Sequence, residues 1–155
     1  MKEIKTTGTL TNQLKEAKPS DLPAYFEENA DSLASGEKPF VAYMRERFNE
    51  KKLRRQDVFL KADISEGYGY KLLSEEKHTV QRDVILRLCL AGEFSLLETQ
   101  RSLKLYGMSE LYAKIPRDAV LIVAINSRRY DVAEVDALLA ENGQPLLYSC
   151  RGAEE

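Results

Sequence analysis

A chain of 155 residues with 43% hydrophobic and 31% charged residues has the composition of one ordinary globular domain. Its net charge of −2 excludes a globally basic nucleic-acid binder, so any DNA-binding surface has to be a local patch. The two cysteines, Cys89 in an apolar helical stretch and Cys150 in the tail, have neither metal-ligand spacing nor the pattern of a disulfide framework. We therefore expect no metal site.

The first ten residues lack the apolar stretch of a secretory signal. No apolar run approaches the roughly 20 residues that a membrane-spanning helix needs. We expect a cytoplasmic protein that has no membrane partner.

The N-terminal part is predicted to begin with an arm and to continue with two helices. Residues 1–10 are rich in lysine and threonine and are expected to be mobile. Thr11 is a suitable cap for a short helix over 12–17. Ser20 is a suitable cap for a second helix, which runs through 24–35 and ends at Gly36.

Apolar residues then recur at three- and four-residue steps, as amphipathic helices require. A helix is predicted after Pro39, because the apolar residues there have this spacing: Phe40, Val41, Met44 and Phe48. Two short helices follow within 53–73, joined by a tight turn at 62–65. A strongly apolar helix starts at Thr79 or Gln81.

Capping signals place the remaining helices. Ser95 and Glu98 form a capping box for a helix that ends at Gly107. Ser109 is expected to cap a short helix over 109–115. Proline at the first position favours helix over strand for 116–130, and Asp131 with Glu134 starts another helix that ends at Gly143. The tail after Gly143 is predicted to be extended and loosely held.

The predicted fold is an all-α, compact helical bundle without strands. We divide it into an N-terminal arm with helices (1–36), a helix-turn-helix bundle (37–107) and a C-terminal helical extension packed on that bundle (108–155). Short connections favour one compact unit over two separate domains.

The segment 40–97 resembles the DNA-binding domain of the Cro/CI-like (XRE-type) repressors. A first helix (FVAYMRERFN), a helix-turn-helix pair, a loop (SEEKHTVQ), a core helix (RDVILRLCLAG) and a Ser-capped turn (FSLLE) follow one another with that family's spacing. The resemblance implies a lambda-repressor-like helix-turn-helix that binds double-stranded DNA, with a homodimer as the expected assembly.

The sequence departs from the family pattern where the two helices cross. Phe59 stands where the family usually has a small alanine, and its ring is expected to force the helices apart unless the bundle repacks. Gly69 stands where a β-branched residue is usual, and Asp63 replaces the glycine of the turn. Asp63 tolerates the left-handed conformation, so its substitution is mild.

The resemblance places the second helix in the major groove and basic residues on phosphates. The residues that we expect at this interface are Arg54, Arg55, Ser65, Glu66, Tyr68, Tyr70, Lys71, Lys77 and His78. At least one of the two tyrosines is expected to pack on the bundle.

A second interpretation keeps the fold but not the DNA. The acidic net charge and the glycines of the second helix favour a protein-interaction adaptor, with a protein partner instead of DNA. Thr7 and Thr11 are each followed three residues later by leucine, and phosphorylation in this segment is one hypothesis for its regulation. No phosphate-binding glycine loop or nucleophile elbow is present, so we predict neither an enzyme nor a cofactor.

Overall fold

The structure, a computed structural model, describes residues 5–33 and 37–150. Within these ranges the chain forms helices and no strand, which confirms the all-α prediction. The α-helices are α1 (Thr7–Leu14), α2 (Leu22–Glu28), α3 (Pro39–Glu50), α4 (Arg55–Ala62), α5 (Glu66–Leu73), α6 (Arg82–Ala91), α7 (Leu96–Tyr106), α8 (Pro116–Asn126) and α9 (Val132–Glu141). Two short 3-10 helices, η1 (Pro19–Asp21) and η2 (Ala30–Ser32), flank α2.

The chain divides into two compact units, residues 1–38 and residues 39–155. In the described part of the first unit, no apolar side chain is buried. Its centre is the buried amide of Asn29, which donates to Gln13 Oε1 (2.9 Å) and accepts from Lys5 Nζ (2.7 Å). Polar contacts therefore hold α1 against the end of α2.

The first helix starts earlier than predicted. Thr6 caps α1 by accepting from the Thr9 backbone N–H (3.2 Å), so the predictions of an arm through residue 10 and of a helix over 12–17 are wrong where the structure describes them. The second predicted helix is also shorter, because the backbone leaves helical geometry at Asn29 (φ −108°, ψ 17°). Gly36 and residues 1–4 lie outside the described residues.

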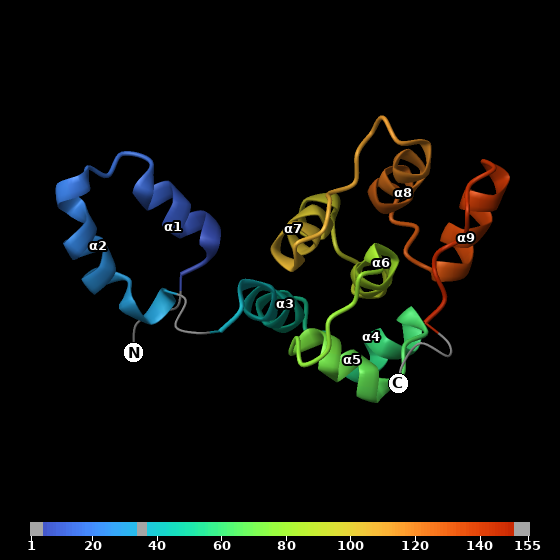
Figure 1. Ribbon diagram of the computed structural model, residues 1–155, viewed down its shortest axis with the longest axis horizontal. Coiled ribbons are helices and arrows are strands. Elements are labelled where there is room, and N and C mark those ends of the chain that lie inside the picture. The colour runs from blue at the N-terminus through green and yellow to red at the C-terminus, as the bar shows by residue number, and fades with distance from the viewer. Residues whose placement is uncertain (1–4, 34–36, 151–155) are drawn as a thin grey trace. The chain divides into compact units, whose positions relative to one another are not determined.

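Helix α6 forms the centre of the second unit (Figure 1). Every residue from Asp83 to Ala91 is buried, which is the expected environment for a helix that is apolar on most sides. Helices α4, α7 and α9 each contact α6, and α3 packs on α7. The Phe40 ring meets Tyr106 edge-on (4.7 Å between centroids), and Phe48 meets Phe94 (6.4 Å).

Helix α7 begins and ends as the sequence predicts. Ser95 Oγ accepts from the Glu98 N–H (3.1 Å), and Glu98 Oε1 accepts from the Ser95 N–H (2.9 Å), which completes the capping box. Gly107 ends the helix in the left-handed conformation (φ 89°).

Residues 109–115 do not form the helix that was predicted there. The Gln100 side chain accepts from the Leu111 N–H (2.7 Å) and donates to the Leu111 carbonyl (2.8 Å). The Tyr112 N–H donates to Asp118 Oδ2 (2.9 Å). These long-range bonds satisfy backbone groups that a helix would otherwise use. Helix α8 then begins at Pro116, so the choice of helix over strand there is confirmed.

An ion cluster joins α3 to α7. Glu98 Oε1 and Oε2 accept from Lys51 Nζ (2.8 Å) and Arg47 Nη1 (3.0 Å), and the Glu98 side chain is only 15% exposed. Burial by itself would raise the pKa of Glu98, but bonds from Lys51, the Ser95 N–H and Arg47 lower it from 4.5 to about 2.

This cluster predicts a loss of stability in acid. Because the folded-state pKa lies below the unfolded value, the stabilising free energy is present above pH 4.5 and disappears as the pH falls towards 2. We expect Glu98→Gln to lower the unfolding free energy by about 1–2 kcal/mol near neutral pH and by almost nothing near pH 2. Urea denaturation of both proteins across this range measures the difference, and a constant difference would contradict the account.

Candidate nucleic-acid interface

The helix pair α4–α5 has the local geometry that the sequence predicts. Asp63 ends α4 in the left-handed conformation (φ 57°, ψ 47°), and Ile64 turns into the core with 5% exposure. Ser65 caps α5 by accepting from the Tyr68 N–H (3.3 Å). Three residues therefore separate two eight-residue helices.

The crossing of the two helices depends on Phe59 and Gly69. Phe59 is 1% exposed, and a Cβ placed on Gly69 would lie only 2.4 Å from two of its ring atoms. The ring thus occupies the space that a side chain at position 69 would fill. The large residue on α4 and the missing side chain on α5 compensate each other, so the expected separation of the helices is avoided by repacking.

One side of α5 faces outward. Gly69, Leu72 and Leu73 are buried, whereas the exposed positions recur at helical spacing: Glu66, Gly67, Tyr70, Lys71 and Ser74. This outward face includes Glu66, Tyr70 and Lys71, which were expected to meet the groove. Tyr68, which was also expected there, is half-buried against the core. Tyr70 is 41% exposed, and its ring packs edge-on against Phe59 (5.2 Å).

A cavity of about 310 Å³ lies between α3, α4 and α5. It brings Arg45, Arg55 and Tyr70 together around an apolar floor that includes Phe48. The Arg55 guanidinium lies over the Phe48 ring, 5.8 Å from its centroid. Arg45 was not among the residues expected at the interface, because its place there depends on how α3 packs against α5.

The other basic residues differ in availability. Arg54, at the cap of α4, and Lys71 are exposed and form no ion pair with any residue in the described ranges. Lys77 is half-buried, and its backbone N–H donates to the Lys71 carbonyl (3.1 Å). Lys51, which precedes Arg54 and Arg55 in the sequence, instead forms an ion pair with Glu98.

Two of the acidic residues near α5, Glu66 and Glu75, have structural roles. Glu66 lies in the first turn, where a carboxylate stabilises the helix dipole. The Glu75 side chain is 9% exposed and lies 3.9 Å from His78 Nε2. His78 stacks on Tyr106 (4.2 Å), whose hydroxyl accepts from the Thr79 N–H (2.8 Å). The loop after α5 is therefore fixed to α7, and Glu75 is turned inward.

The described residues contain no group of three or more histidine, cysteine or acidic side chains arranged to hold a metal ion. None of the helices in the described ranges has the length and apolar character needed to cross a membrane. Comparison with protein-family models, curated proteins and solved structures found no match for this chain.

Proposed function

We propose that the second unit binds double-stranded DNA, with α5 in the major groove. The observation that carries the proposal is the exposed side of a Ser-capped second helix, held at a tight turn, next to a cavity lined by two arginines. An α-helix fits the major groove, and its outward side chains can reach base edges. The protein is expected to act as a transcription regulator, and a homodimer would pair two half-sites.

The residues divide into two roles in this proposal. Arg54, Arg55 and Arg45 contact phosphates, which set affinity and salt dependence. Tyr70 and Lys71 face the groove, and Lys71 can donate to guanine acceptors. A Cβ added to Gly67 would meet nothing within 4 Å, so the backbone there can approach a partner closely.

We expect the affinity for a mixed-sequence duplex to fall steeply with salt. Arg55→Ala/Lys71→Ala removes one phosphate contact and one groove contact, so it should weaken binding at low salt and make the slope of log affinity against log salt shallower by about 1. Fluorescence anisotropy of a labelled duplex over a series of salt concentrations measures both quantities.

The matched control is Arg129→Ala, which removes an exposed charge between α8 and α9. It should leave affinity and slope close to those of the unmodified protein. Thermal melts of all three proteins separate lost contacts from lost folding. An equal effect of Arg129→Ala, or no binding even at low salt, would contradict the proposal.

Absence of DNA binding would favour the second function, a non-enzymatic adaptor that uses the same fold to bind protein. The observation in its favour is that Glu66 on the outward face and Glu76 just after α5 are both exposed, because exposed acids repel phosphates. The hypothesis that Thr7 or Thr11 is phosphorylated applies to either function. Both residues are exposed on α1, and mass spectrometry of the protein from its native cell detects the modification.

A further inference from the structure

The tail segment, residues 144–150, forms neither helix nor strand, and the prediction that it is loosely held is wrong. Its backbone takes part in six hydrogen bonds with side chains of three helices. They are Arg117 Nε to Pro145 O (3.0 Å), Arg117 Nη2 to Leu146 O (3.0 Å), Leu147 N to Asp136 Oδ1 (2.9 Å), Arg87 Nη2 to Leu147 O (3.4 Å), Arg87 Nε to Tyr148 O (2.6 Å) and Tyr148 N to Asp83 Oδ2 (2.8 Å).

Each of these bonds ends on a backbone group of the tail. Arginines meet its carbonyls and aspartates meet its N–H groups, so the charged side chains complement a peptide backbone whatever its sequence. Along the tail, Leu147 (4% exposed) and Cys150 (1%) enter the core, whereas Leu146 (54%), Tyr148 (37%) and Ser149 face outward. Backbone bonds combined with pockets for some side chains are how proteins recognise extended peptides.

The four charged residues form a fixed platform. Arg117 binds Asp83 through both nitrogens (2.9 and 2.8 Å), and Arg87 also donates to the Ala62 carbonyl at the end of α4 (3.1 Å). Burial alone would raise the pKa of Asp83, but hydrogen bonds from Arg117 and from the Tyr148 N–H lower it, so the acceptor stays ionised. The platform is therefore preorganised for its occupant.

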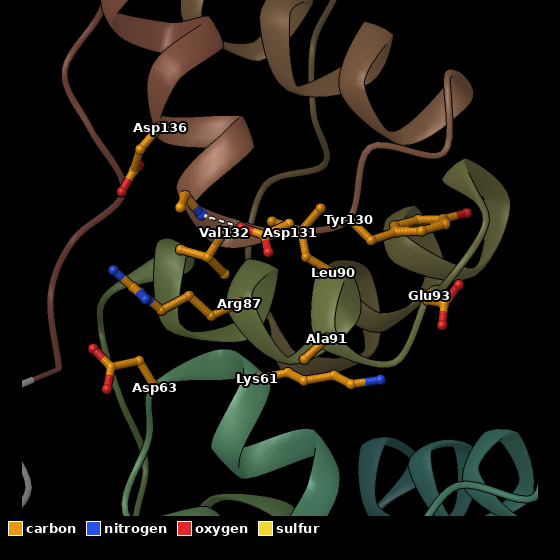
Figure 2. Close-up of a pocket in the computed structure, with 11 residues that line it drawn as sticks. Lys61, Asp63, Arg87, Leu90, Ala91, Glu93, Tyr130, Asp131, Val132 and Asp136 are labelled. Carbon is orange, nitrogen blue, oxygen red and sulfur yellow. Dashed lines mark hydrogen bonds between the residues drawn. The ribbon is translucent and has the colours of Figure 1, made fainter.

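A cavity of about 540 Å³ adjoins this platform (Figure 2). Arg87 and Asp136 contribute to its lining and hold the tail at the same time, while Leu90, Ala91 and Val132 supply apolar surface. Side chains of a peptide seated at the platform would have open space beside them.

We propose that Asp83, Arg87, Arg117 and Asp136 form a peptide-binding groove that the chain's own tail segment occupies in cis, and that the tail segment of a second copy occupies it in trans. An identical tail segment makes the same six bonds and fills the same Leu147 pocket without any new chemistry. Gly143, in the left-handed conformation (φ 70°), connects the tail segment to α9 and provides a hinge for the exchange. This proposal does not depend on DNA binding.

The experiment measures binding of a fluorescein-labelled synthetic peptide with the sequence of residues 143–150 to the full chain. Leu147→Ala in the chain weakens the competing cis tail, so this variant should bind the peptide at least about tenfold more tightly than the unmodified chain. Leu146→Ala, which changes an exposed neighbour, is the matched control and should bind like the unmodified chain. A peptide carrying alanine in place of Leu147 should not bind to any of the three.

Sedimentation of the unmodified chain gives a test that needs no variant. We expect a monomer–dimer equilibrium in which added peptide converts dimers to monomers. Peptide binding that is equal for the unmodified and Leu147→Ala chains, with Leu147→Ala shown by circular dichroism to be folded, would overturn the groove. A chain that remains monomeric at every concentration, or dimers that the peptide leaves intact, would overturn the exchange between copies.

Discussion

Gly69→Val is expected to destabilise the second unit by about 2–4 kcal/mol. A Cβ alone would come within 2.4 Å of the Phe59 ring, and valine adds two methyl groups at that position. Overpacking of a buried site costs typically 1–3 kcal/mol, and valine also loses more χ1 freedom in a helix than smaller residues do. Urea denaturation followed by circular dichroism measures the change in unfolding free energy.

A substitution of Phe59 tests whether the sizes of the residues at positions 59 and 69 compensate each other or whether valine at position 69 is simply too large. Phe59→Ala should cost about 3–5 kcal/mol because it leaves a cavity beside the glycine. The double variant Phe59→Ala/Gly69→Val has a small residue on α4 and a β-branched residue on α5, so the valine can occupy space that the ring has left. The double variant should therefore recover at least about 2 kcal/mol relative to the sum of the two single effects. Strict additivity of the two substitutions would contradict the packing described for the helix pair.

Asp118→Ala is expected to be similarly damaging, at about 3–5 kcal/mol. The Asp118 side chain is 1% exposed, binds Arg82 through both carboxylate oxygens and accepts from the Tyr112 N–H (2.9 Å). Removal of the carboxylate leaves a partly buried guanidinium and an unpaired backbone donor. Thermal and urea denaturation both report the loss.

A hydrophobic replacement of the pair supplies the control for Asp118. Arg82→Met/Asp118→Leu removes both charges, so it should be less destabilising than Asp118→Ala alone, although the Tyr112 N–H remains unpaired. If the double variant were the less stable protein, the damage would come from lost packing and not from an uncompensated charge.

Local sequence signals predicted most of the helices because their causes are local. The Ser95 capping box, the left-handed Gly107 and the proline that opens α8 each act within one helical turn. The segment 109–115 could not be predicted in this way, because Gln100 and Asp118 bind its backbone from other elements. The same is true of the tail, whose partners on α6, α8 and α9 are far away in sequence.

In the candidate site, too, local features could be predicted from the sequence, whereas contacts between distant residues could not. Helical spacing was enough to place Glu66, Tyr70 and Lys71 on one exposed side of α5. It could not show that Arg45 would join Arg55 around a cavity or that Lys51 would be bound by Glu98, since both depend on the packing of α3. The compensation between Phe59 and Gly69 could also be recognised only in the three-dimensional structure, because each residue alone departs unfavourably from the usual helix-turn-helix pattern.

The central claim is that the outward face of α5, with the arginines beside it, contacts duplex DNA. The most direct test is a ¹⁵N NMR titration of the full chain with a mixed-sequence duplex at low salt. We predict that the largest amide shifts occur in residues 54–55 and 65–71, and that raising the salt reverses them. Shifts confined to other helices, or none at all, would contradict the claim.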